Sequence, residues 1–327
     1  MIDGHLVALV IGMLSSKLER GYVFDLVATP PNDHGEAACS LVETTANKDD
    51  KGKGSKSVSL VSLSIDNDWV AEHARQVQRM LVGGIKVIGV YVWVSDSCFK
   101  NSTMMLCQTL KAVAEAAAHL ETDSDERLLI HISFILCGWA CRYCLLPSNI
   151  TSTSLKPCDF KMGKVLSSFQ RFRCMYNFDL SEKDVVGSVC SFAYLNSNEP
   201  VSQAVAYIKD VLIRSLQGRL DVICDEADDL ILGSREANNE ISCGKPVSHF
   251  VLHELRKICY LSFLWRVFVP WLAGIYICDY LQSFETAEVS SKDHCVELMS
   301  METPSKVLEA EVEAPSLITK SFWEVVV

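Results

Sequence analysis

One segment constrains the fold of this chain more than any other: residues 85–94, Ile-Lys-Val-Ile-Gly-Val-Tyr-Val-Trp-Val. The run is rich in β-branched residues and apolar at odd and even positions, which is typical of a strand covered on both faces. It follows Gly83-Gly84, which we expect to end a helix that begins near Asp66 and Asp68. The sequence therefore predicts a helix followed by a central strand of a sheet.

Other apolar patterns place further elements around this strand. Strands are predicted at residues 6–13, 21–29 and 127–136, and a helix from about Ser102 to Leu120. Residues 32–57 are rich in Asn, Asp, Gly, Lys and Ser and are predicted to form a long loop. Together these elements predict an α+β fold, a mixed α/β sheet flanked by helices.

The second half of the chain is patterned less clearly. Residues 145–185 give only a weak assignment, whereas residues 200–224 predict a long helix and residues 264–270 and 274–281 predict two strands. The predicted apolar stripe of that helix is Val201, Val205, Ile208, Leu212 and Leu216. We therefore expect an N-terminal domain at 1–136, a second α+β region at 137–284 and an acidic, disordered tail at 285–327.

Composition excludes some classes of function. A length of 327 residues favours about two domains. The net charge of −11, with no cluster of Lys and Arg, argues against nucleic acid as a partner. The chain has 14 cysteines but opens without the positive region of a signal peptide, so we expect reduced thiols and a cytosol-facing protein.

The end of the central strand resembles the metalloprotease-type MPN domain. Active members of that family follow Gly-x-Tyr with His-Ser-His-Pro, and Ser-x-x-Asp comes seven residues later; the two His and the Asp bind zinc. In this chain Val92 and Val94 occupy the positions of the two His ligands, and Trp93 occupies the position of the Ser between them. Ser102 falls at the position of the second motif's Ser, but Met105 stands three residues later where the Asp ligand would be. Hydrocarbon and thioether side chains cannot replace these ligands on zinc.

The resemblance therefore implies a degenerate MPN-like domain with no catalytic residues, no metal and no cofactor. MPN domains commonly pair with one another, so apolar positions of the first helix are candidates for an interface as well as for the core. The candidate interface residues are Val70, Val77, Leu81 and Trp93.

Several blocks resemble a second and more specific family. The block Asp66-Asn-Asp-Trp-Val-Ala-Glu-His-Ala, which continues to Val90, is similar to the signature of the odorant response abnormal protein 4 family. Further blocks are Leu129-Ile-His-Ile132, the helix around residues 204–209, and Arg266-Val-Phe-Val-Pro270 followed by Cys278-Asp-Tyr280. The resemblance extends from about residue 8 to residue 281.

This resemblance implies a non-enzymatic adaptor at the cytosolic face of the endoplasmic reticulum membrane. The family acts in the localisation of membrane receptors and as a partner of the cysteine protease specific for the ubiquitin-fold modifier. Its members usually end in a membrane-spanning helix, whereas this sequence stops at Val327 before one and is short between Leu180 and Ser188. We therefore expect this form to reach the membrane through a partner or to remain peripheral or cytosolic.

Three alternatives remain open. The first is a zinc-dependent MPN-type hydrolase with unusual ligands. The second is a zinc site built from Cys137, Cys141 and Cys144, with Cys158 beyond, or from His249 and His253. The third is that residues 258–277 contact or span the membrane, although Arg266 and Pro270 disfavour a span and the family match favours a pair of strands.

Overall fold

The computed structural model describes residues 6–15, 20–45, 59–118, 126–134, 138–145, 154–164, 166–180, 185–218, 259–262, 265–272, 274–281, 290–301, 309–310 and 316–319. Its contacts group the chain into two compact units. The first comprises Met1–Leu81, Ile85–Ser168 and His294–Thr303; the second comprises Val82–Gly84, Phe169–Asp293 and Pro304–Val327. The boundary that the sequence predicts at residue 136 lies inside the first unit.

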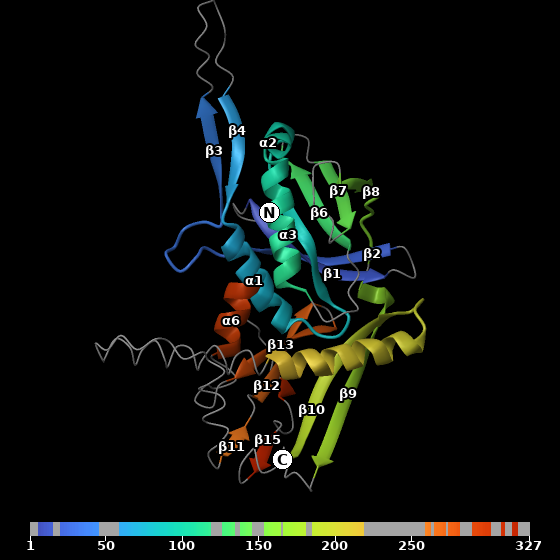
Figure 1. Ribbon diagram of the computed structural model, residues 1–327. Helices are drawn as coiled ribbons and strands as arrows, with labels where there is room; N and C mark the ends of the chain where they lie inside the picture. Colours follow the sequence, from blue (N-terminus) through green and yellow to red (C-terminus); the bar gives the residue numbers. More distant parts are fainter. Residues whose placement is uncertain are drawn as a thin grey trace, which may run out of the picture. The chain divides into compact units, whose positions relative to one another are not determined.

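The first unit is built on a mixed six-stranded sheet (Figure 1). Its order is β2 (Arg20–Ala28), β1 (Val7–Ser15), β5 (Lys86–Trp93), β6 (Glu126–Ser133), β7 (Gly138–Leu145) and β8 (Lys156–Cys158). Strands β5 and β6 run parallel, and every other neighbouring pair is antiparallel. The central place of β5 and the α+β fold are both confirmed.

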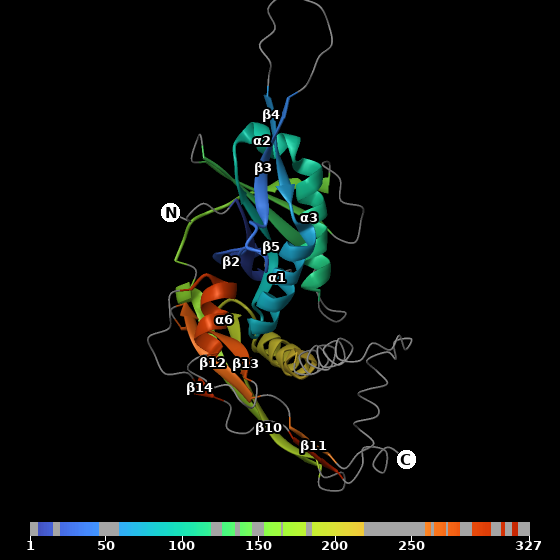
Figure 2. The ribbon, with the colours of Figure 1, turned by 90° about the vertical axis from the view of Figure 1, so that its left-hand side faces the viewer.

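Two helices, α1 (Asn67–Met80) and α3 (Thr103–Ala116), pack beside this sheet (Figure 2). Helix α1 begins where predicted, because the Asp66 carboxylate accepts a hydrogen bond from the Trp69 backbone N–H at 3.0 Å. It ends at Met80, before Gly83-Gly84, where Leu81 turns to extended backbone. The helical face of the sheet contributes Leu9, Val92 and Leu129, all fully buried.

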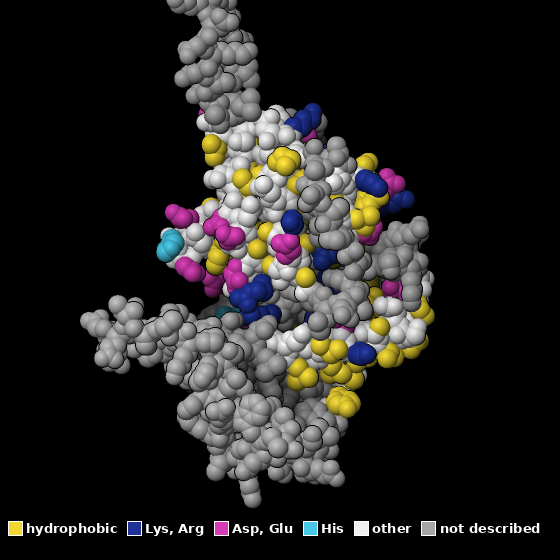
Figure 3. All heavy atoms as spheres, in the orientation of Figure 1, with side chains coloured by type: hydrophobic (Ala, Val, Ile, Leu, Met, Phe, Trp, Pro, Cys, Tyr) yellow, Lys and Arg dark blue, Asp and Glu magenta, His cyan; other side chains and the backbone are white. Residues whose placement is uncertain are grey.

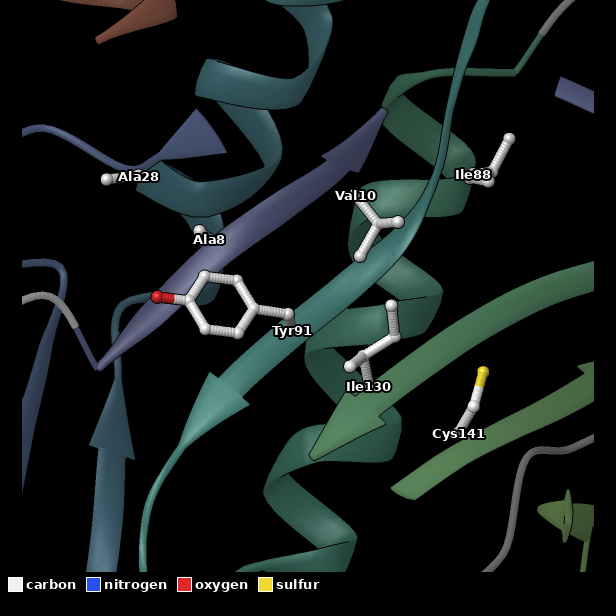
Figure 4. Packing of buried hydrophobic residues seen from close by; sticks show 7 residues of the cluster. All are labelled: Ala8, Val10, Ala28, Ile88, Tyr91, Ile130 and Cys141. Carbon is white, nitrogen blue, oxygen red and sulfur yellow. The ribbon is translucent and has the colours of Figure 1, made fainter. Parts of the chain in front are cut away.

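The opposite face of the sheet carries its own apolar cluster. The cluster consists of Ala8, Val10, Ala28, Ile88, Tyr91, Ile130 and Cys141. In Figure 4 these side chains lie in front of the strands while α3 passes behind them. The two layers account for the apolar character of β5 at successive positions, because residues 90 and 92 face the helices and Tyr91 faces the second cluster.

A two-stranded hairpin, β3 (Cys39–Thr45) with β4 (Ser59–Ile65), lies outside the main sheet. The prediction of a loop over residues 32–57 is therefore wrong for residues 39–45, which pair with β4 along its whole length. A short helix, α2 (Asp96–Asn101), was also not predicted; the Ser95 side chain caps it by accepting from the Cys98 N–H at 3.3 Å. The short 3-10 helix η2 (Leu166–Ser168) ends the main part of this unit.

The described residues of the second unit form two small antiparallel sheets. One has the order β11 (Cys259–Ser262), β15 (Ser316–Thr319), β10 (Val185–Asn196) and β9 (Phe169–Leu180). The other has the order β13 (Ile275–Leu281), β12 (Trp265–Leu272) and β14 (Glu309–Ala310). Strands β12 and β13 confirm the predicted pair of strands.

Aromatic packing forms the core of the second unit. The ring of Phe192 packs edge-on against Phe268, with centroids 4.7 Å apart, and stacks on Tyr276 at 5.1 Å. The buried guanidinium of Arg266 lies over Phe268 and donates a hydrogen bond to the Cys190 carbonyl oxygen. In the described part of the chain, no helix is long and apolar enough to cross a membrane.

The helix over residues 201–218 buries a different face from the one predicted. Val201 and Val205 of the predicted stripe are 70% and 63% exposed, while Ala204, Val211 and Ser215 are buried. The buried positions therefore hold alanine, valine and serine instead of the predicted larger side chains. Figure 3 shows hydrophobic side chains gathered on the exposed side of this helix.

Part of the segment predicted as a disordered tail is folded. Helix α6 (Ser290–Met299) lies within residues 285–327, and its Cys295 and Met299 side chains are buried. The Ser300 hydroxyl donates to the Ala28 carbonyl oxygen at 3.3 Å, and Ser300 adopts a left-handed φ of 49° just after the helix. The contact attaches the end of α6 to the end of β2.

Candidate functional site

The end of β5 is where the sequence places the remains of a metal centre. Val92 and Val94, at the presumed His positions, are both fully buried. Trp93 points to the opposite face, where its ring packs edge-on against Phe134 with centroids 6.3 Å apart. Neither valine can bind a metal, so the two presumed ligand positions hold hydrocarbon side chains instead of ligands.

Ser102 and Met105 have structural partners. The Ser102 hydroxyl oxygen accepts a hydrogen bond from the Leu63 backbone N–H at 2.7 Å, which fastens strand β4 to the start of α3. The Met105 sulfur accepts from the Asn67 side-chain amide at 3.7 Å. Asn67 in turn accepts from the Thr109 hydroxyl at 2.6 Å. These contacts join α1, α3 and the hairpin.

Three polar side chains, those of His131, Ser133 and Asp96, meet beside Val94. His131 lies in the Leu129–Ile132 block of the family resemblance, but sequence reasoning assigned no role to any of the three. His131 is buried, and its Nε2 donates to the Val94 carbonyl oxygen at 3.0 Å. Its Nδ1 lies 3.9 Å from the Asp96 carboxylate, which is too far for a hydrogen bond. The Asp96 carboxylate accepts a hydrogen bond from the Ser133 hydroxyl at 3.4 Å. Alternation along β6 places residues 131 and 133 on one face, a signal that the sequence does contain.

This His131 group does not have the geometry of a nucleophile with its base. A catalytic serine must be hydrogen-bonded to an imidazole nitrogen, whereas Ser133 donates to the carboxylate of Asp96. The His131 ring is held by the Val94 carbonyl oxygen and is stacked on Phe99 at 4.3 Å. The group therefore attaches the ends of β5 and β6 to α2.

The cysteine zinc site that the sequence left open does not assemble. Cys141 and Cys144 are three positions apart on β7 and so point to opposite faces of the sheet. Cys141 lies in the apolar cluster away from the helices, whereas Cys144 lies near Cys107 of α3. Cys137, His249 and His253 lie outside the described residues. Across the described ranges, no group of three or more His, Cys, Asp or Glu is arranged to hold a metal ion.

Most of the candidate interface residues belong to the core. Val70 and Val77 are fully buried, and Leu81 is only 4% exposed. Of the two roles that the sequence allowed for these side chains, packing inside the first unit is the one observed. Trp93 is half-buried and so retains accessible surface beside Phe134, which is 47% exposed.

The signature block Trp69-Val-Ala-Glu-His-Ala74 joins distant segments to α1. The Trp69 indole N–H donates to the Pro30 carbonyl oxygen at 2.9 Å. The His73 Nε2 donates to the Leu298 carbonyl oxygen at 2.8 Å, and its Nδ1 lies 3.3 Å from the Thr29 hydroxyl. A block that resembles a functional motif in sequence is thus an attachment point for α6 and for the segment after β2.

Burial determines the charge state of His73. Its side chain is 1% exposed, and desolvation lowers its pKa from 6.5 to about 4, although the bond to the Leu298 carbonyl opposes the shift. At neutral pH the ring is therefore uncharged. With Nε2 as the donor, Nδ1 accepts the proton of the Thr29 hydroxyl, so both ring nitrogens are satisfied.

Comparison with known proteins places these features in a family. The family model described as odorant response abnormal 4-like matches residues 8–183 and 184–310. Relatives named protein odr-4 homolog include one from Dictyostelium discoideum, 24% identical over 86% of this chain and 72% of its own length. The relative from Xenopus laevis is 28% identical over 43% of this chain, and the relative from Homo sapiens is 28% identical over 49% of it.

The match spans about a third (32%) of the length of each of those two vertebrate relatives. No solved structure matches the chain. The family model covers most of the sequence, including the Trp69–Ala74 block and the β12–β13 hairpin. The chain belongs to the odorant response abnormal 4-like family.

Proposed function

We propose that this protein is a non-enzymatic adaptor that acts in the localisation of membrane receptors. The observation that carries the proposal is family membership over most of the chain. The buried hydrocarbon at Val92 and Val94 supports a role without metal hydrolysis. The rival function, a zinc-dependent hydrolase, has no observation in its favour at these positions.

The proposed partner is the cysteine protease specific for the ubiquitin-fold modifier, and the clients are membrane receptors. The proposed location is the cytosolic face of the endoplasmic reticulum membrane, reached through a partner or a tail anchor. A degenerate MPN-like character of the first unit belongs to the same proposal. The mixed sheet with helices beside it is compatible with that character.

Trp93 and Phe134 form the surface that we assign to the protease. Their rings pack edge-on, and Phe134 is 47% exposed. Large aromatic side chains contribute a disproportionate share of binding energy at protein interfaces. The pair also lies on the sheet face away from α1 and α3, where β5 and β6 end, so a partner can approach it without displacing those helices.

The experiment combines size-exclusion chromatography of the purified chain mixed with the purified protease and a titration that measures their affinity. We expect the two to co-elute in size-exclusion chromatography, and we expect Trp93→Ala to weaken binding at least about tenfold, the effect of losing one aromatic anchor. The matched control is Met104→Ala, a change at a 56% exposed side chain on α3, which should alter affinity less than about twofold.

Two outcomes would reject parts of the proposal separately. Absence of co-elution at micromolar concentrations would reject the protease as a direct partner. Co-elution that Trp93→Ala leaves unchanged, with an unchanged melting temperature, would reject the assigned surface but keep the partner. Cleavage of ubiquitin-like conjugates by the chain alone would reject the non-enzymatic role.

A further inference from the structure

Two reduced thiols face each other across the last pair of strands in the main sheet. Cys141 of β7 and Cys158 of β8 are direct partners in the antiparallel register. The two side chains are close enough to influence each other's ionisation, and neither takes part in a disulfide. The pair lies at the edge of the sheet, because β8 is its outermost strand.

The strand ladder fixes the backbone geometry at this pair. The next pair along the ladder is Arg142 with Pro157. Proline has no N–H, so that pair is of the non-hydrogen-bonded type, and the alternation of the ladder makes Cys141–Cys158 a hydrogen-bonded pair. Such pairs have Cα atoms about 5.5 Å apart, inside the roughly 4.4–6.8 Å range of disulfides. Their Cβ atoms are also about 5.5 Å apart, so they must approach to about 3.8 Å for the bond to close.

The two thiols differ in access. Cys141 is 8% exposed and lies in the apolar cluster with Tyr91 and Ile130, and burial raises its pKa. Cys158 is half-buried on the edge strand. Because thiol exchange begins with an accessible thiolate, Cys158 is the residue that an external reagent meets first.

We propose that Cys141 and Cys158 are a redox-active dithiol oxidised by a low-molecular-weight disulfide of the glutathione class. The Cys158 thiolate attacks one sulfur of that disulfide, releases one thiol and forms a mixed disulfide. Cys141 then loses its proton and attacks the Cys158 sulfur, which expels the second thiol. The protein loses two electrons and two protons in total, and the external disulfide is reduced to two thiols.

The bond would change how firmly β8 is held. Strand β8 has only three residues, and Phe160, two positions after it, stacks on Trp139 with centroids 5.4 Å apart. The Trp139 side chain is 45% exposed even with this ring against it. A disulfide fastens β8 to β7 and keeps Phe160 close to Trp139, whereas the reduced pair leaves β8 attached by a short ladder.

The same strand provides a matched control. Cys144 is buried like Cys141 but lies on the other face of β7, near Cys107 of α3. Burial raises its pKa to about 11. A substitution at Cys144 therefore removes a buried thiol from β7 without touching the Cys141–Cys158 pair.

The test uses the full chain equilibrated in buffers of increasing oxidised-to-reduced glutathione ratio. Samples are acid-quenched, alkylated and digested, and linked peptides are identified by mass spectrometry; parallel samples undergo hydrogen exchange. We expect a Cys141–Cys158 peptide to accumulate, with β8 amides exchanging about 100-fold more slowly, the effect of closing a loop of about 15 residues. Cys158→Ser should abolish both effects, and Cys144→Ser should retain both.

Several results would overturn the proposal. Full alkylation of Cys141 and Cys158 at the most oxidising ratio would show that the pair is only packed together. A linkage of either residue to a different cysteine would show that the register does not direct the reaction. A Cys141–Cys158 bond that leaves β8 exchange unchanged would remove the proposed consequence. Because Cys158 is half-buried, Cys158→Ser should keep the melting temperature of the reduced protein, which separates loss of the bond from loss of the fold.

Discussion

The Nε2 atom of His73 lies 2.8 Å from the backbone carbonyl oxygen of Leu298, a residue 225 positions later in the chain. The bond ties α1 to α6 inside the first unit. The other ring nitrogen lies 3.3 Å from the Thr29 hydroxyl, just after β2. One buried imidazole thus links three segments that are far apart in sequence, which makes His73 the best place to test how this unit is held together.

Replacing His73 with Ala should destabilise the first unit by about 2–4 kcal/mol. The change leaves the Leu298 carbonyl oxygen and the Thr29 hydroxyl without their partner and opens a cavity at a 1% exposed position. Urea unfolding of wild type and variant measures the difference. The control is His34→Ala at an exposed loop position, which should change stability by less than about 0.5 kcal/mol; equal effects of the two changes would contradict the role of His73.

Stability should fall as the pH decreases from about 6.5 to about 4. The pKa of His73 is lowered to about 4 by burial, so in this window the unfolded chain binds a proton at this position that the folded chain does not. The stability contributed by the neutral ring is complete above pH 6.5 and lost as the pH falls, up to ~3 kcal/mol. The measurement compares wild type with His73→Gln at several pH values, because subtraction removes the effect of other groups. The difference in unfolding free energy should shrink on acidification, and a constant difference would refute the prediction.

The sequence predicted the helices and strands whose own pattern of apolar residues shows which side chains are buried. Strand β5 could be predicted because its run is apolar throughout, and α1 because Asp66 caps an amphipathic pattern. Strand β3 could not, since Cys39–Thr45 contains Ser, Glu and Thr and is stabilised by pairing with β4. The Ser102 hydroxyl that fastens β4 lies 39 positions from its partner, Leu63, and no local pattern reports such a contact.

The same limit explains why the sequence could not decide which side chains come together. The stripe of helix 201–218 follows helical spacing, but tertiary packing selects the face with Ala204 and Ser215 instead. The cysteines at 141 and 144 are close in sequence, yet strand geometry separates their thiols. His73 stood in a specific block, but its role depends on Leu298, whose helix lies in the segment predicted as a tail.

Val92→Asp should unfold the first unit. Val92 is fully buried on the helical face of β5, and burying a carboxylate without a partner costs several kcal/mol, comparable with the stability of a whole domain. The matched control is Val201→Asp at a 70% exposed position, where the change should be less than about 0.5 kcal/mol. Circular dichroism during thermal unfolding distinguishes the two. A cooperatively melting Val92→Asp protein with an unchanged midpoint would contradict the assigned strand.

Gly89→Ala should destabilise the parallel pair β5–β6 by about 3 kcal/mol. A Cβ atom at Gly89 would lie 2.0 Å from the Leu128 carbonyl oxygen, and the nearest atoms all belong to the backbone, so the strands themselves must move. Gly138→Ala, at the start of β7, is the control because a Cβ there has nothing within 4 Å. Both variants are compared by urea unfolding. If they unfold at the same urea concentration, close approach of the two strands is not what requires Gly89.

The purified chain should contain no stoichiometric zinc and should not cleave ubiquitin-like conjugates. At the positions of the presumed ligands, Val92 and Val94 offer only hydrocarbon, and the Met105 sulfur accepts a hydrogen bond from Asn67. Cys141 and Cys144 cannot share an ion, because they lie on opposite faces of β7. Elemental analysis after dialysis, with an active MPN protease as the positive control, measures the metal directly. Zinc near one equivalent that disappears when Cys141 and Cys144 are both changed to Ser would mean that β7 is assigned wrongly. Zinc that survives that double change would instead direct attention to the residues outside the described part of the chain, His249 and His253 among them.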